Sequence, residues 1–141
     1  VRCAVRPGVG RLQRQAAGAR IPLGQLGDPT HLKPLGVPGL DKDGRVVRII
    51  EKPEDPPSAY GVTGIYFYPP DVFQVIPTLA PSNRGELEIT DVNNHYVGLH
   101  QMEYDVLEGF WGDGGESIEA YYEVNDFVRA HGANKELSVA K

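Results

Sequence analysis

The chain has 141 residues, of which 40% are hydrophobic and 23% are charged, and its formal net charge is −5. These values are typical of one globular domain, and they exclude a membrane helix because no stretch approaches the roughly 18 consecutive apolar residues that such a helix needs. The single cysteine, Cys3, excludes an intramolecular disulfide and a cysteine-based zinc site, so we expect a cytoplasmic protein without a membrane partner.

The first 40 residues differ in composition from the remainder of the chain. They contain five arginines and one lysine against a single acid, Asp28, and they are rich in glycine and proline. Residues 1–30 show neither helical nor strand periodicity, so we expect a loop or disordered segment there and an organisational boundary at residues 35–40. A basic arm for nucleic acid is the alternative, but interleaved aromatic residues are lacking, and we expect no nucleic-acid partner.

Three stretches after this boundary predict strands. Residues 36–40 and 45–51 flank an Asp-Lys-Asp-Gly turn at 41–44 and predict a hairpin, because Asp-Gly supplies the positive φ of a tight turn. Residues 61–68 are apolar on both faces, which predicts a central strand covered by helices. Residues 102–106 alternate between apolar and acidic side chains and predict a half-exposed strand.

Three helices are predicted between and after these strands. The first is short and begins at Asp71; its expected buried side carries Val72, Phe73, Val75, Ile76 and Leu79. The second helix begins at about Glu86, and the third is capped by Ser117 and ends near Gly132. One face of the third carries Ile118, Tyr121, Tyr122, Asn125 and Val128. Because strands and helices alternate, the predicted class is α/β.

Two stretches carry charges that packing alone does not require. Glu51-Lys52-Pro53 ends a strand, where α/β sheets place ligand-binding residues; lysine suits a phosphate and the carboxylate suits sugar hydroxyls, with a solvated charge pair as the alternative. Residues 82–91 are typical of a helix start, with acids in the first turn. Arg84 opposes the helix dipole there, so it is a candidate for binding an anion or an acidic neighbour.

A third stretch, Phe110 to Gly115, is dense in glycine and contains the only tryptophan. Asp113 within it is a candidate ligand for Mg²⁺, which takes one or two carboxylates together with substrate phosphates. An aspartate that only forms a turn is the alternative.

Together these stretches resemble the second half of the sugar-phosphate nucleotidyltransferases, most closely those that act on glucose 1-phosphate and thymidine triphosphate. Five elements in family order carry the resemblance: the turn at 41–44, Glu51-Lys52-Pro53, residues 62–68, residues 84–91 and Trp111-x-Asp113-x-Gly115. The resemblance covers about residues 36–131. The expected domains are therefore an irregular segment at 1–35 and a sugar-phosphate-binding half at 36–141. The implied fold is a Rossmann-like, mixed and mostly parallel sheet with covering helices, here incomplete.

The resemblance also implies an activity and roles for individual residues. Glucose 1-phosphate and dTTP would give dTDP-glucose and pyrophosphate, with Mg²⁺ as cofactor. Lys52, which contacts the sugar phosphate in the family, and Asp113, the metal ligand, are the expected catalytic residues, and Arg84 would lie near a phosphate or regulatory site. The expected substrate-binding residues are Gly36, Glu51, Lys52, Val62, Gly64, Tyr66 and Trp111.

The first half of the family's pattern is not convincingly present. The family's phosphate-cradling loop, Gly-x-Gly-Thr-Arg-Leu, has only a superficial echo at residues 8–12, Lys33-Pro34 is a similarly weak echo of a lysine segment, and Glu116 replaces a usual threonine. We therefore expect a partial chain without the nucleotide-binding half. A non-catalytic remnant that binds only sugar phosphate or a partner is the alternative. Exposed strand edges would then favour self-association or a homo-oligomer.

Overall fold

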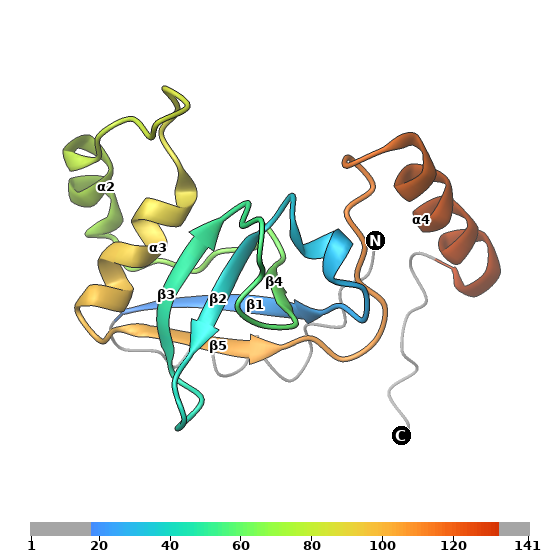
Figure 1. Ribbon diagram of the computed structural model, residues 1–141, viewed down its shortest axis with the longest axis horizontal. Helices are drawn as coiled ribbons and strands as arrows, with labels where there is room; N and C mark the ends of the chain where they lie inside the picture. Colours follow the sequence, from blue (N-terminus) through green and yellow to red (C-terminus); the bar gives the residue numbers. More distant parts are fainter. Residues whose placement is uncertain (1–17, 133–141) are drawn as a thin grey trace, which may run out of the picture. The chain divides into compact units, whose positions relative to one another are not determined.

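The computed structural model describes residues 18–132 (Figure 1). These residues fall into two compact units, a larger unit of residues 18–107 and a smaller unit of residues 108–132. Within the described residues, every helix falls short of the length and apolar character that crossing a membrane would need.

The larger unit contains a three-stranded mixed sheet in the order β4-β1-β5. The central strand β1 (Ala19–Gln25) pairs in parallel with β5 (Met102–Val106) and antiparallel with β4 (Tyr60–Val62). Six of the seven residues of β1 are buried, as expected of a strand paired on both sides. The mixed sheet of the predicted α/β class is thus present, and β5 confirms the strand expected at 102–106.

Strand β1 corrects the expectation of a loop or disorder over residues 1–30. In the described part of that segment, Ala19–Gln25 is a strand and Pro29–Leu32 is a 3₁₀ helix, η1. Pro22 lies where pairing to β4 is interrupted, between the Leu23–Val62 pair and an isolated bridge at Phe67, so its missing N–H costs no ladder bond. Residues 1–17, including the echo at 8–12, lie outside the described residues.

The absence of alternation in β1 has a physical cause. Arg20 is buried among apolar neighbours because its guanidinium forms ion pairs with Glu103 and Asp105 on the adjacent strand β5. Ile21 and Leu23 enter a hydrophobic core with residues of other elements. A buried, ion-paired arginine and a tolerated proline therefore conceal the strand from pattern analysis.

The predicted hairpin is confirmed as β2 (Gly36–Leu40) and β3 (Val46–Glu51), which pair antiparallel with Gly36 opposite Glu51. The Asp41 carboxylate accepts hydrogen bonds from the backbone N–H groups of Asp43 (2.9 Å) and Arg45 (2.8 Å), which closes the turn. The same turn contains a glycine at φ +77°.

The central strand expected at 61–68 is wrong. Only Tyr60–Val62 forms a strand, and Phe67 contributes an isolated bridge to β1. Gly64, at φ +77°, interrupts the extended backbone between them. In addition, β4 lies at one edge of the three-stranded sheet, and β1 occupies its centre.

Helix α3 (Ile89–Gly98) packs against β3 in the larger unit (Figure 1). It begins at Ile89 rather than at about Glu86, because a hydrogen bond of 2.8 Å from the Ser82 N–H to the Glu86 carbonyl closes a turn at those residues. Tyr96 is fully buried on its inner face.

The short helix expected after Asp71 is α2 (Val72–Val75), which continues as a 3₁₀ turn, η2 (Ile76–Thr78). Its Val72 and Val75 are buried, but Phe73 and Ile76 are exposed, which corrects the wider buried side that was expected. Asp71 makes no side-chain cap; its carboxylate instead accepts a hydrogen bond of 2.7 Å from the Tyr96 hydroxyl.

In the smaller unit, α4 (Ile118–His131) has the predicted boundaries. The Ser117 hydroxyl accepts a hydrogen bond of 3.0 Å from the Ala120 N–H, and Gly132 ends the helix at φ +77°. Val124 is buried, whereas Ile118 and the two tyrosines of the expected apolar face are exposed.

Candidate functional site

An open pocket of about 420 Å³ lies in the larger unit where β3 ends. Its walls come from the end of β3, from the loop at 82–88 and from the first turns of α3. Three residues singled out from the sequence, Glu51, Lys52 and Arg84, line this pocket together. The structure therefore brings together the two charged stretches, residues 51–53 and 82–91, which are separated by nearly 30 residues in the sequence.

Glu51 occupies the last position of β3 and is held from α3. Its Oε2 atom accepts a hydrogen bond of 2.5 Å from the hydroxyl of Thr90, a buried residue of the helix. Gly36 lies opposite in the hairpin, and a Cβ atom there would be only 3.2 Å from the Thr90 hydroxyl oxygen. Glycine at 36 thus permits the close approach of helix and hairpin that orients the Glu51 carboxylate.

Lys52 directly follows β3 and has an unusual backbone. Its φ of +45° lies in the left-handed region, which a residue with a side chain rarely adopts. Its N–H donates a hydrogen bond of 2.9 Å to the Leu35 carbonyl, which helps to hold this conformation. Such strain persists only where surrounding structure enforces it, and it is common at binding sites. The ammonium-bearing side chain is exposed at the pocket.

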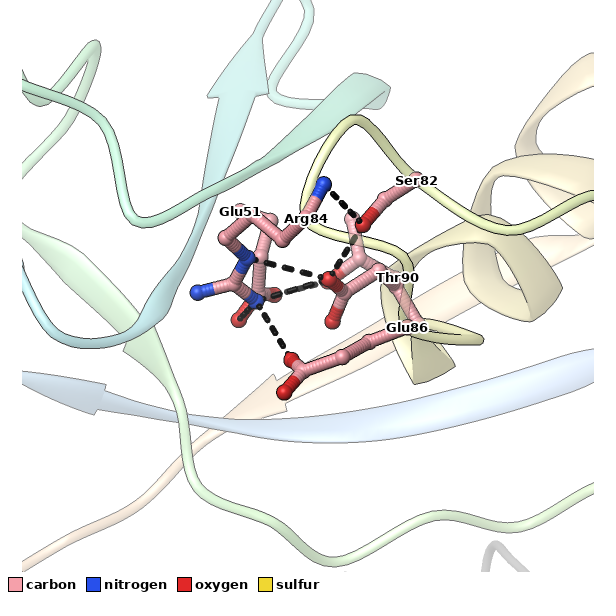
Figure 2. Close-up of polar contacts among 6 residues, drawn as sticks. Glu51, Ser82, Arg84, Glu86 and Thr90 are labelled. Atoms are coloured by element: carbon pink, nitrogen blue, oxygen red, sulfur yellow. Dashed lines mark hydrogen bonds and ion pairs between the residues drawn. The ribbon is translucent and has the colours of Figure 1, made fainter.

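Arg84 is surrounded by carboxylates (Figure 2). Its Nε and Nη2 atoms lie 3.3 Å and 2.7 Å from Glu88 Oε1, and Nη2 lies 3.4 Å from Glu86 and 3.9 Å from Glu51. These contacts explain a cation close to a helix N-terminus, where the dipole alone would disfavour it. The hydrogen bond with Arg84 also lowers the pKa of Glu88, and the same bond raises the pKa of Arg84.

Backbone contacts fix the loop that carries Arg84. The Ser82 carbonyl accepts a hydrogen bond of 2.8 Å from the N–H of Gly85, which has φ +77°. The Ser82 hydroxyl accepts from the Arg84 N–H (3.2 Å) and donates to Glu88 Oε1 (2.9 Å). Ser82 therefore stabilises this turn, whereas the sequence indicated the start of a helix.

Asn94, a residue not predicted from the sequence, also joins α3 to β3. The Asn94 side chain accepts from the Ile49 N–H and donates to the Ile49 carbonyl, both at 2.8 Å. The Asn94 amide thereby binds the backbone N–H and carbonyl of Ile49 as an adjacent strand would. Its spacing of four residues from Thr90 puts both polar side chains on the same side of α3, which is the one signal that could have indicated this role.

The other expected substrate-binding residues of the larger unit lie in different surroundings. Tyr66 is half-buried, and burial together with the negative charge of Glu51 raises its phenol pKa. Val62 belongs to the hydrophobic core that includes Ile49, and Gly64 is exposed. Among these three residues, Tyr66 is therefore the one whose pKa is affected by the negative charge of Glu51.

Trp111 and Asp113 belong to the smaller unit. Asp113 is exposed, and its Oδ1 accepts a hydrogen bond of 2.9 Å from the Gly115 N–H, which makes it the turn residue of this loop. Over residues 18–132, no group of three or more histidine, cysteine or acidic side chains is placed to hold a metal ion. Asp113 could therefore contribute one oxygen donor to a cation that has other ligands.

Comparison with known proteins shows extensive similarity to one family. Residues 20–131 match the family model described as nucleotidyl transferase. A glucose-1-phosphate thymidylyltransferase of Streptomyces antibioticus is 40% identical over 111 residues, which are 78% of this chain and 30% of that protein. The low-salt glycan biosynthesis nucleotidyltransferase Agl11 of Haloferax volcanii is 38% identical over 112 residues, which are 79% of this chain and 30% of that protein.

Solved structures show the same similarity. A Bacillus anthracis protein provisionally assigned as a glucose-1-phosphate thymidylyltransferase, crystallised with sucrose, has 37% identity and a TM-score of 0.78, covering 93% of this chain and 51% of that chain. A UDP-glucose pyrophosphorylase complexed with UDP-glucose has a TM-score of 0.76 at 22% identity, covering 90% of this chain and 50% of that chain, which shows a shared fold.

Two facts about coverage qualify these matches. The chain spans about a third of the length of the curated relatives and about half of the solved chains. The family match begins at residue 20, not near residue 36 as the sequence motifs suggested, so it includes β1.

Proposed function

This chain belongs to the nucleotidyl transferase family, and we propose that it provides the sugar-phosphate site of an enzyme that makes dTDP-glucose from glucose 1-phosphate and dTTP. Its mixed sheet with helices is the Rossmann-like fold of the solved nucleotidyltransferases that it resembles. Relatives named as glucose-1-phosphate thymidylyltransferases support this choice of sugar and nucleotide.

One observation carries the proposal: the pocket at the end of β3 combines an oriented carboxylate with two cationic side chains. Thr90 occupies one oxygen of Glu51, which leaves Oε1 as an acceptor for a sugar hydroxyl. Lys52 and Arg84 line the same pocket and suit a phosphate group. A hexose phosphate needs a hydrogen-bond acceptor for its hydroxyls and cationic side chains for its phosphate, whereas a simple anion needs only the cationic side chains.

In the proposed reaction, an oxygen of the sugar phosphate attacks the α-phosphorus of dTTP. One P–O bond forms while the bond to the β-phosphate breaks, and pyrophosphate leaves with the electron pair. Catalysis of this kind depends on alignment and on neutralising charge. Lys52 and Arg84 would hold the phosphate, and Glu51 would orient the sugar through its hydroxyls.

The proposal also includes a role for Asp113. Its Oδ2 atom makes no hydrogen bond within the described residues, and a single carboxylate oxygen fits the way in which proteins bind Mg²⁺ together with substrate phosphates. Mg²⁺, when bound, would neutralise charge on the triphosphate.

Isothermal titration tests the proposal, with glucose 1-phosphate, glucose and dTTP each titrated in the presence of Mg²⁺. We expect saturable binding of glucose 1-phosphate, and weaker binding of it by Lys52→Gln. Absence of glucose 1-phosphate binding would contradict the proposal.

A second candidate function is sugar-phosphate binding without transfer, which is favoured by the small share of each relative that the chain spans. Pyrophosphate release from glucose 1-phosphate and dTTP distinguishes the two functions. Release that Asp113→Ala abolishes supports the transferase, and binding of glucose 1-phosphate without release supports the alternative.

A further inference from the structure

Glu88 is the centre of the contacts around Arg84. Its Oε1 atom accepts hydrogen bonds from the Ser82 hydroxyl (2.9 Å) and from Arg84 Nε (3.3 Å) and Nη2 (2.7 Å). The Glu88 side chain is 12% exposed, against 43% for Arg84 and 67% for Glu86. Glu88 is therefore the least exposed of the three side chains, whereas Arg84 and Glu86 both extend further into solvent.

These contacts occupy only one edge of the Arg84 guanidinium. Nε and Nη2 bind Glu88, whereas Nη1 makes no hydrogen bond to any described residue. In Figure 2 no dashed line joins Nη1 of Arg84 to the residues drawn. The carboxylates of Glu86 and Glu51 also approach Nη2, at 3.4 Å and 3.9 Å. The Nη1 edge is thus available to a ligand while the other edge is held.

We propose that Glu88 is a positioning residue, which holds Arg84 so that the open edge of its guanidinium receives the phosphate of the sugar phosphate. This inference rests on the proposed function. An exposed arginine loses side-chain freedom when it binds an anion, and an arginine that is already ordered avoids this cost. Ser82 contributes by fixing the same oxygen of Glu88.

In the opposite role, Glu88 would compete with phosphate for Arg84. Competition would occur through the edge that the phosphate needs, but Glu88 binds Nε and Nη2 and leaves Nη1 uncommitted. The two roles predict opposite signs. Neutralising a positioning carboxylate weakens phosphate binding, whereas neutralising a competitor strengthens it.

The test compares the affinities of Glu88→Gln and Glu86→Gln for glucose 1-phosphate and for glucose. Both variants remove one negative charge from the same loop, but Glu86 makes only the longer contact to Arg84. We expect Glu88→Gln to weaken glucose 1-phosphate binding about tenfold, by loss of preorganisation, and to leave glucose binding unchanged. Glu86→Gln should not weaken it.

A double-mutant cycle with Arg84→Gln shows whether Glu88 acts through the arginine. Glu88→Gln should have no further effect on affinity when Arg84 is already replaced. An equal loss in that background would mean that Glu88 only supports the loop and would overturn the inference. Tighter binding of glucose 1-phosphate by Glu88→Gln would overturn it as well.

A measurement without ligand separates this inference from the proposed function. Solvent exchange of the Arg84 Nε–H, followed by NMR, should be slow in the wild-type protein and fast in Glu88→Gln. If the wild-type protein fails to bind glucose 1-phosphate, the proposed function is wrong, and the exchange rate still shows whether Glu88 orders Arg84. Equal exchange rates in the two proteins would overturn the inference.

Discussion

Lys52 has a backbone conformation that favours glycine, yet it carries a charged side chain at the pocket. A φ of +45° brings Cβ close to the backbone and costs about 1 kcal/mol for a residue other than glycine. The strain lies one residue after Glu51, where β3 ends and the chain leaves the sheet. This conformation turns the chain away from the sheet at Lys52, the residue proposed to bind the phosphate of the substrate.

Replacing Lys52 separates stability from binding. Both Lys52→Gly and Lys52→Ala remove the ammonium group, so both should bind glucose 1-phosphate more weakly than the wild-type protein. Lys52→Gly should be more stable than Lys52→Ala by about 1 kcal/mol, because only glycine relieves the positive φ. Urea unfolding of the two variants measures the difference, and equal stabilities would show that the backbone at 52 is not strained.

At the scale of elements, the contact between α3 and β3 determines the geometry of the site. Asn94 joins the helix to both backbone polar groups of Ile49, and Thr90, one turn earlier, joins it to Glu51. A shift of α3 along the strand would break both contacts. The orientation of the Glu51 carboxylate therefore depends on a side-chain amide in the middle of a helix.

Asn94→Ala should destabilise the protein by about 2 kcal/mol, because it removes two hydrogen bonds and leaves the polar groups of a buried residue without partners. Asn125→Ala is a matched control. The Asn125 amide also bonds to a backbone carbonyl, but it is exposed on α4, so its loss should cost less than about 0.5 kcal/mol. Urea unfolding gives both values, and similar losses would contradict the special role of Asn94.

Elements determined by local chemistry were predictable from the sequence. The hairpin depends on Asp41 and Gly44, and the start of α4 depends on Ser117, so a few neighbouring residues suffice in each case. Strand β1 was missed because Arg20 is buried by ion pairs to a strand more than 80 residues away, which a local pattern does not contain. The sequence predicts too long a β4 because a glycine at 64 is compatible with a strand, and only the structure shows its φ of +77°.

The residues of the candidate site likewise fall into those that the sequence predicts and those that it does not. Glu51 and Lys52 could be proposed from the sequence because they lie at a recognisable strand end, whereas Gly36 was implied only by the resemblance to the family. Thr90 and Asn94 could not, since their roles exist only when α3 packs on β3. Glu88 was interpreted as a first-turn acid, but its carboxylate instead binds Arg84 and Ser82.

At the scale of the whole molecule, tyrosines link stability to alkaline pH. Burial, with a smaller effect of the hydrogen bond to Asp71, raises the pKa of Tyr96 to about 12 from its ordinary 10.0. Burial also raises the pKa of Tyr68, whose hydroxyl donates to Asn93 Oδ1 at 2.6 Å. The folded state therefore holds these phenol protons more tightly than the unfolded chain does.

This difference predicts loss of stability on the alkaline side. The contribution of Tyr96 is complete below pH 10.0, where both states are protonated, and it is lost as the pH rises toward about 12. Tyr96→Phe should reduce the fall in the free energy of unfolding between these values. Tyr122→Phe, at an exposed position of α4, should leave the fall unchanged. Identical pH profiles for Tyr96→Phe and the wild-type protein would contradict the prediction.

The three-stranded sheet also bears on the association of whole chains. Within the described residues, β5 pairs only with β1, so one edge of β5 has no strand partner. Open edges favour pairing with another chain, and a charged side chain on the edge discourages it. Val106 is exposed on β5, and Val47 is similarly exposed but lies on β3 of the hairpin.

We expect the wild-type protein to self-associate as its concentration rises. Val106→Lys should weaken that association, and Val47→Lys should leave it unchanged. Size-exclusion chromatography with light scattering, over a range of concentrations, measures all three. A sharp monomer peak for the wild-type protein at every concentration and salt level would show that this edge does not pair with a second chain.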